Sequence, residues 1–302
     1  MLKKWTIRHP VTLSGIGIHS GRPVRLTLKP SASGAVSFRR TDRGGRAVDL
    51  DSRNIETGNR SVLGSGSGSI QTVEHLLAVL YALGLDSLDI EVEGGEIPIF
   101  DGSAGPLAAA LVGAGVEALS EDKVCARIVR PLDVEEAGAS LSISPDEDFR
   151  ITYRIDFPHP AVGVQSISLT LTRKAFLEEI APARTFGFLK DVTELRRKGL
   201  ALGGSLNNAL VLDENKIING PLRFPDEFVR HKLLDLIGDL ALFGRPLLGH
   251  FQADRAGHAL HVRAVRLLSD TPGSWALETA AAPRYLLDGA GLPCQRPPSA
   301  LK

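Results

Sequence analysis

The chain of 302 residues has few cysteines, no excess of charge of either sign and no long hydrophobic run. Its two cysteines, Cys125 and Cys294, stand in no C-x-x-C or other metal-ligand spacing, so a disulfide framework is not indicated. Lys plus Arg and Asp plus Glu both number 35, which leaves no net charge to attract nucleic acid or an anionic membrane. The charge balance therefore argues against a nonspecific polyanion-binding protein.

Targeting signals are also lacking. The segment Met1–Pro10 has basic residues without the apolar stretch of a signal peptide, and no later segment approaches the length of an uninterrupted membrane span. We therefore expect a cytoplasmic protein without stable membrane insertion. Nothing in the sequence fixes the oligomeric state, and a monomer is the default expectation.

The first part of the chain alternates between strand and helix patterns. Short segments of alternating polarity predict strands at Val24–Lys29, Val36–Arg39 and Leu88–Glu93. The segments Thr72–Leu83 and Pro106–Val112 are apolar around most of their circumference, which is typical of packed helices. Together these elements predict one unit built from a sheet and two helices.

A second cycle of the same kind begins near Cys125. The predicted strands are Ala126–Val134, Ala139–Ser144, Phe149–Phe157 and Ser166–Leu171, and the predicted helices are Lys174–Ile180 and Asp226–Phe243. The short charged stretch Ser120–Lys123 separates the two cycles and is our expected domain boundary. We predict an α+β protein of two similar two-layer domains, residues 1–122 and 123–291, followed by a mobile proline-containing tail at 292–302.

The helix predicted at Asp226–Phe243 has two chemically different faces. At 100° per residue, one side collects Val229, Leu233, Leu236, Ile237 and Leu240, which we expect to face the core. The other side carries a row at His231, Asp235 and Asp239, with Lys232 beside it. Such a row is either an ordinary solvated charge ladder or, because His and Asp at i and i+4 can share a cation, half of a zinc site.

Glu74 and His75 open a helix whose later turns are nearly all apolar. Burying two ionisable groups costs several kcal/mol unless they are paired. One interpretation places Glu74 at the helix amino terminus and His75 as an ordinary core histidine. The other makes His75 the third ligand of a zinc site with His231 and Asp235, and Glu74 the base that removes a proton from water.

Two further segments carry groups suited to a hydrolytic site. His258 follows a polar loop, and a position near Asp239 would favour its cationic form, which can protonate a leaving amine. Thr185 offers a hydroxyl for an oxyanion, and Phe186 offers an aromatic face for a sugar or base. Either segment is also compatible with a purely structural role, and the role of His19 stays open.

Several segments, in order along nearly the whole chain, resemble the UDP-3-O-acyl-N-acetylglucosamine deacetylase family, zinc enzymes of lipid A synthesis in bacteria with an outer membrane. The spaced combination of TVEH, HKLLD and GHAL is more specific than any single motif. The matching segments are SGIGIHSG (Ser14–Gly21), TVEHLLA (Thr72–Ala78), IFDGSAGP (Ile99–Pro106), ARTFGF (Ala183–Phe188), LGGSLNNA (Leu202–Ala209), RFPDEFVRHKLLDLIGDL (Arg223–Leu240) and AGHAL (Ala256–Leu260).

The resemblance implies two similar α+β domains with the site between them. It implies zinc held by His75, His231 and Asp235, and Glu74 as the general base. The same N/N/O ligands accept iron(II), so the metal in the cell is not settled by the sequence.

For the remaining positions, the resemblance implies that His258 is the general acid or electrostatic partner and that Asp239 sets its charge and orientation. Thr185 would help to stabilise the oxyanion, while Lys232 and Phe186 would contact substrate.

The implied reaction is hydrolysis of the acetamide of UDP-3-O-(3-hydroxyacyl)-N-acetylglucosamine, a small-molecule substrate, with release of acetate. The segment Gly199–Leu212 is the candidate for an insert that forms an apolar passage for the acyl chain. Two alternatives stay open: a zinc amidase of another substrate class, and a nucleotide-sugar binding protein that holds no metal. The preferred acyl length is not fixed by the sequence.

Overall fold

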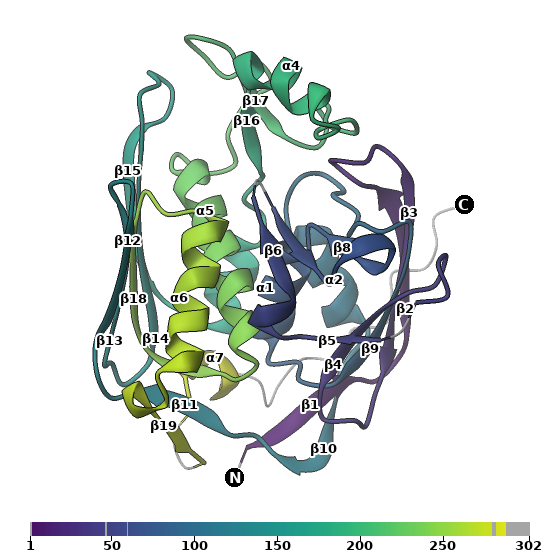
Figure 1. Ribbon diagram of the computed structural model, residues 1–302, viewed down its shortest axis with the longest axis vertical. Coiled ribbons are helices and arrows are strands. Elements are labelled where there is room, and N and C mark those ends of the chain that lie inside the picture. Colours follow the sequence, from purple (N-terminus) through teal and green to yellow (C-terminus); the bar gives the residue numbers. More distant parts are fainter. Residues whose placement is uncertain (1, 46, 59, 280–281, 288–302) are drawn as a thin grey trace.

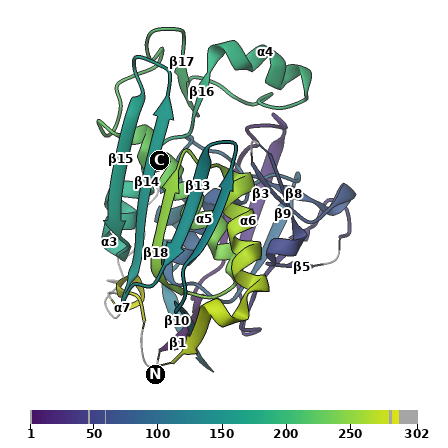
Figure 2. The same cartoon turned by 60° about the vertical axis from the view of Figure 1, so that its left-hand side comes forward.

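Two large sheets flank a layer of helices in the computed structural model, which describes residues 2–45, 47–58, 60–279 and 282–287. The helices α1 (Glu74–Leu83), α5 (Glu227–Leu240) and α6 (His258–Asp270) lie between the sheets (Figure 1). A turned view shows the same order, with the sheet of the second half in front of the helices (Figure 2). The mixed α+β class predicted from the sequence is confirmed.

The first half of the chain builds a five-stranded sheet in the order β2-β3-β9-β4-β5. Its neighbours are antiparallel except for β4 and β9, which are parallel. Its strands are β2 (Val11–Ile16), β3 (Pro23–Pro30), β4 (Val36–Arg40), β5 (Val48–Asp49) and β9 (Leu88–Glu93). The smaller pieces are the pair β1 (Lys3–Ile7) and β10 (Val116–Asp122), the meander β6 (Ile55–Thr57), β7 (Ser61–Leu63) and β8 (Ile70–Gln71), the short helices η1 (Ser52–Asn54) and η2 (Gly66–Gly68), and α2 (Gly105–Gly113).

The second half builds a seven-stranded sheet around β18, which pairs with β11, β13 and β14. Its strands are β11 (Cys125–Ile128), β12 (Leu132–Glu136), β13 (Ala139–Ser144), β14 (Phe149–Phe157), β15 (Gly163–Thr170), β18 (Leu247–Asp254) and β19 (Trp275–Glu278). The remaining elements are α3 (Arg173–Ala175) with the π-helical turn η3 (Phe176–Ile180), the parallel pair β16 (Phe186–Phe188) and β17 (Leu210–Leu212) with α4 (Leu189–Arg197) between them, η4 (Ala241–Phe243), η5 (Pro272–Ser274) and α7 (Arg284–Leu287).

The predicted elements recur with small differences in their bounds. The single strand expected at Ala126–Val134 is divided into β11 and β12. Pro131 lies between them and has no N–H group for a sheet ladder, and the N–H groups of Val129 and Arg130 bond instead to Ser274. Helix α1 starts at Glu74 because Thr72, which precedes it, has a φ of 58°, outside the helical region.

Helix α5 is buried along its polar row as well as its apolar stripe, so the interpretation of that row as a solvated ladder is wrong. The apolar stripe packs toward β14 and β15, while the row at His231, Asp235 and Asp239 faces α1 and α6. All three polar residues are less than 5% exposed. Their hydrogen bonds and charges are therefore satisfied by protein groups or a bound ion rather than by bulk water.

The expected division after residue 122 coincides with the end of β10, which pairs back onto β1 at the start of the chain. The organisation into two domains stays a prediction. The tail expected to be mobile, residues 292–302, lies outside the described residues. Within the described part of the chain, no helix has the length and apolar composition that crossing a membrane requires.

Candidate active site and metal centre

The site begins with an unusually close approach of two helices. A Cβ atom built on Gly238 of α5 would lie only 2.1 Å from the backbone carbonyl oxygen of Glu74 in α1. Only glycine permits this distance, because real Cβ contacts are far longer. The approach brings the amino-terminal turn of α1 against the polar row of α5, although the two helices are separated by about half the chain.

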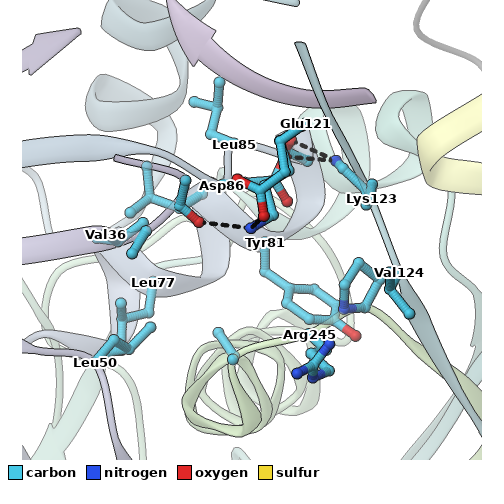
Figure 3. A pocket seen from close by; sticks show the side chains of 18 of the residues that line it. Val36, Leu50, Leu77, Tyr81, Leu85, Asp86, Glu121, Lys123, Val124 and Arg245 are labelled. Carbon is cyan, nitrogen blue, oxygen red and sulfur yellow. Dashed lines mark hydrogen bonds and ion pairs between the residues drawn. The ribbon is translucent and has the colours of Figure 1, made fainter. Parts of the chain in front are cut away.

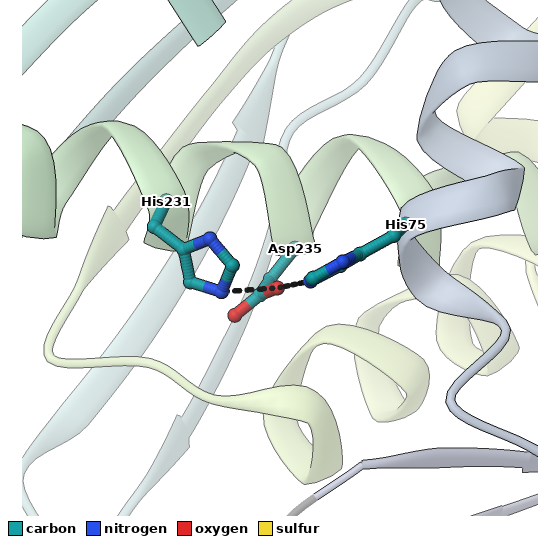
Figure 4. Close-up of side chains that lie close together, drawn as sticks. All are labelled: His75, His231 and Asp235. Carbon is teal, nitrogen blue, oxygen red and sulfur yellow. Dashed lines mark ion pairs between the residues drawn. The ribbon is translucent and has the colours of Figure 1, made fainter. Parts of the chain in front are cut away.

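The three predicted metal ligands meet at this contact. His231 Nε2 lies 3.5 Å from Asp235 Oδ1, and His75 Nε2 lies 3.8 Å from the same oxygen. Both rings point toward Asp235, one from α5 and one from α1 (Figure 4). The ligand atoms lie within 4.8 Å of one another, which is the spacing of a group that can hold one metal ion.

Hydrogen bonding and burial prepare these groups for coordination. His231 Nδ1 donates to the carbonyl oxygen of Ala183 at 3.1 Å, which leaves the Nε2 lone pair free to face Asp235. Burial, with His231 nearby, lowers the pKa of His75 to about 3, and burial also lowers the pKa of His231. Both imidazoles are therefore neutral, the form that binds metal.

Asp235 is held as a carboxylate. Burial alone would raise its pKa, but the neighbouring Lys232 and His231 outweigh that effect and keep the pKa well below its usual range. Lys232 Nζ lies 2.7 Å from Asp235 Oδ2, so the ammonium occupies one oxygen while the other faces the histidines. The predicted substrate contact of Lys232 is not tested by this arrangement.

A second cluster adjoins the first and contains the predicted base and acid. His258 Nδ1 donates to Asp239 Oδ2 at 2.7 Å, while its Nε2 faces Glu74 Oε1 at 3.8 Å and Asp235 Oδ2 at 3.9 Å. Ser61 in β7 donates from its hydroxyl to Asp239 at 2.7 Å and from its backbone N–H to Glu74 at 3.2 Å. The two predicted proton-transfer groups therefore face each other beside the ligands.

The surroundings of Glu74 and His258 raise the pKa of both groups above their ordinary values. Burial raises the pKa of Glu74 to about 7, against the opposing effect of His258. Burial alone would lower the pKa of His258, but the Asp239 carboxylate outweighs it and raises the value to about 9. Between these values one group can accept a proton while the other can donate one.

The segment that carries Thr185 and Phe186 is tied to the amino-terminal turn of α5. Arg184 makes a two-pronged ion pair with the buried Glu227, at 2.8 and 3.0 Å. This pair fixes the ARTF segment beside α5, where the Phe186 ring lies 6.4 Å from that of His231. The backbone N–H of Thr185 donates to Gly102 O at 2.8 Å, which ties the segment to the first half of the chain.

The insert and the His19 loop meet at the rim of the site. The N–H of Leu202 donates to the carbonyl oxygen of His19 at 3.0 Å, and the N–H of Ala201 donates to His19 Nδ1 at 3.3 Å. Burial lowers the pKa of His19 to about 4, although Glu96 acts in the opposite direction. Leu202 and Leu206 of the insert are 52% and 54% exposed.

Four residues of the site were missed by the sequence analysis. Ser61 and Glu96 come from short or irregular segments without a pattern, and Glu96 accepts hydrogen bonds from the backbone of His19 and Ser20. His261 and Tyr153 form a buried network behind Asp239. The spacing of the two histidines in HALH, one turn apart, was the only available signal for His261.

A separate cavity of about 320 Å³ lies toward the carboxyl end of α1 and contains none of these residues (Figure 3). Leu77 and Tyr81 of α1 line it. Its buried ammonium, Lys123 Nζ, lies 2.9 Å from Asp86 Oδ2 and is already neutralised. We therefore assign the chemistry to the other end of the helix.

A His/His/Asp group with a carboxylate and a cationic histidine beside it, in an α+β fold, defines the class of metal-dependent hydrolases. The family model described as UDP-3-O-acyl N-acetylglycosamine deacetylase matches residues 4–270. A protein of Nitratidesulfovibrio vulgaris named UDP-3-O-acyl-N-acetylglucosamine deacetylase is 45% identical over 273 residues, covering 89% of this chain and 88% of the relative. A protein of the same name from Myxococcus xanthus is 44% identical over 292 residues, covering 95% and 92%.

The chain therefore belongs to the UDP-3-O-acyl N-acetylglycosamine deacetylase family. The resemblance inferred from its motifs is confirmed. Members of this family are metalloenzymes, and the described residues contain His/Asp groups with the spacing that such an enzyme requires.

Proposed function

We propose that this chain hydrolyses the acetamide of UDP-3-O-(3-hydroxyacyl)-N-acetylglucosamine, releasing acetate and the free amine, the committed step of lipid A synthesis. The observation that carries the proposal is the convergence of His75, His231 and Asp235 with Glu74 and His258, in a chain 45% identical to a protein named UDP-3-O-acyl-N-acetylglucosamine deacetylase.

Zinc is the metal we propose, held by His75, His231 and Asp235. Two neutral imidazoles and one carboxylate suit zinc and leave a coordination position for reaction. The ligands also suit iron(II). A divalent ion at this position supplies Lewis acidity, which polarises a carbonyl and lowers the pKa of water.

The proton transfers are assigned to Glu74 and His258. Glu74, ionised above about pH 7, accepts the proton of the attacking water at its Oε1. His258, held as a cation by Asp239, donates from Nε2 to the departing sugar amine. The separation of 3.8 Å between the two atoms supports their acting side by side on one reacting group.

The other predicted residues would bind and orient substrate. Thr185 would donate its hydroxyl to the developing oxyanion, and Phe186 and Lys232 would contact the sugar nucleotide. The exposed leucines of the segment Gly199–Leu212 support its role as an apolar passage for the acyl chain. A site between two similar domains would open such a passage to solvent.

We further propose that the reaction takes place in the cytoplasm and that the enzyme acts as a monomer. The low cysteine content supports a reducing compartment.

The test is release of acetate from UDP-3-O-(3-hydroxyacyl)-N-acetylglucosamine by the purified protein, before and after chelation and after restoration of zinc. Release that is lost on chelation and restored by zinc supports the proposal. Equal release from N-acetylglucosamine derivatives without UDP would indicate an amidase of another substrate class. Tight binding of the substrate without any release or bound metal would indicate a nucleotide-sugar binding protein.

A further inference from the structure

Asp239 is surrounded by three hydrogen-bond donors, and two of them, Ser61 and His261, have no role in the reaction described above. The Asp239 Oδ1 atom accepts from Ser61 Oγ at 2.7 Å. Its Oδ2 atom accepts from His258 Nδ1 at 2.7 Å and from His261 Nδ1 at 2.9 Å. Because a carboxylate only accepts, both imidazoles carry a proton on Nδ1.

His261 is also contacted at its second nitrogen. Its Nε2 lies 3.0 Å from the hydroxyl oxygen of Tyr153, whose single proton is donated to the carbonyl oxygen of Ala256 at 2.7 Å. His261 and Tyr153 are both fully buried. The Tyr153 ring meets the His261 ring edge-on at 5.9 Å, so the His261 ring is held by packing as well as by its Nδ1 hydrogen bond.

This network bears on the direction in which His258 points. The side chain of an aspartate rotates about its terminal bond, so one imidazole alone leaves its plane poorly defined. Ser61 on one oxygen and His261 on the other fix both atoms of the Asp239 carboxylate. The orientation of His258 follows, because its Nδ1 bond to Asp239 determines where Nε2 points.

We propose that His261 is a positioning residue for the reaction: it holds Asp239 so that His258 presents Nε2 toward Glu74 and the leaving amine. The inference rests on the proposed function and adds one residue to it. His261 reaches His258 through Asp239, and its ring also meets the His258 ring edge-on with 6.0 Å between the centroids. Groups at this distance from a reaction centre change activity by about 10–100-fold when they are removed.

Two substitutions separate positioning from mere packing. His261→Leu fills a similar volume but gives no donor to Asp239, whereas His261→Asn retains an N–H group near the position of Nδ1. We expect His261→Leu to lower kcat by about 10-fold or more, with KM and bound zinc unchanged. His261→Asn should recover most of that loss.

A double-mutant cycle gives the second readout. In a His258→Ala background there is no imidazole to orient, so His261→Leu should lower kcat by less than about 2-fold. An equal loss in both backgrounds would overturn the proposal, as would a wild-type kcat for His261→Leu. If His261→Leu fails to fold, Tyr153→Phe replaces it in the same cycle. This substitution removes the hydroxyl group that contacts His261 Nε2, and we expect the same coupling.

The outcomes distinguish this inference from the proposed function. A wild-type protein that releases no acetate refutes the proposed function and the inference with it. A wild-type protein that releases acetate, with no coupling between positions 261 and 258, refutes the inference alone.

Discussion

Replacing Gly238 with alanine is expected to separate the two helices that assemble the site. The added Cβ would lie 2.1 Å from Glu74 O, 2.8 Å from Glu74 C and 3.1 Å from Glu74 Cα. An ordinary carbon–oxygen contact is about 3.3 Å, so α1 must move by about 1 Å relative to α5. No flexible side chain can yield instead, because all three atoms belong to the backbone.

The effect on stability and the effect on activity should differ in size. Overpacking costs about 1–3 kcal/mol, while alanine gains about 1 kcal/mol of helix propensity over glycine, so the net loss of unfolding free energy is at most about 2 kcal/mol. A shift of about 1 Å between reacting groups can lower the rate about 100-fold. Because His75 moves with α1 while His231 stays on α5, zinc should also bind more weakly.

Gly113→Ala is the matched control, because Gly113 ends helix α2 and its added Cβ meets no atom within 4 Å. We expect it to leave acetate release unchanged and to alter stability by no more than about 1 kcal/mol. Urea unfolding gives the free energies, and acetate release with metal analysis gives the activities and zinc contents. Wild-type activity and zinc content in Gly238→Ala would refute the reasoning.

Three further predictions follow from the assigned roles. Glu74→Ala should keep its zinc but lose about 100-fold to 10,000-fold in kcat, and unchanged turnover would remove Glu74 as the base. His231→Ala should lose both zinc and acetate release, and a variant that retains either would not fit a three-ligand site. With rising pH, kcat/KM should increase through about 7 as Glu74 loses its proton and decrease through about 9 as His258 loses its own, and a profile without the alkaline decrease would exclude His258 as the acid.

The sequence predicts the fold to the extent that local patterns decide it. Period-two alternation located strands such as β9 and β14, and apolar composition located α1. The sequence could not show that α5 is buried on its polar side as well. Burial there depends on α1 and α6, which pack against α5 from distant parts of the chain. A helical wheel describes one helix and says nothing about the surfaces that cover it.

The residues of the candidate site were likewise predicted only in part. The motifs and the family resemblance they carry predicted the three ligands and the two proton-transfer groups, each of which belongs to a helix with its own signature, and these roles stay predictions. The groups that hold them in place were missed: Ser61 lies in a strand of three residues, and the Ala183 carbonyl that orients His231 is a backbone atom. Supporting interactions of this kind depend on tertiary contacts and leave little trace in local sequence.

The two carboxylate oxygens of Asp235 have different partners, which explains how several charged groups are buried together. Its Oδ2 atom is neutralised by Lys232 at 2.7 Å, while Oδ1 faces two neutral imidazoles and has no hydrogen bond to either at 3.5 and 3.8 Å. A carboxylate oxygen and two imidazole lone pairs that face one another repel each other unless a positive charge lies among them. A divalent cation held by these three groups would turn that repulsion into attraction, so the folded chain favours the metal through the same arrangement that positions it for reaction.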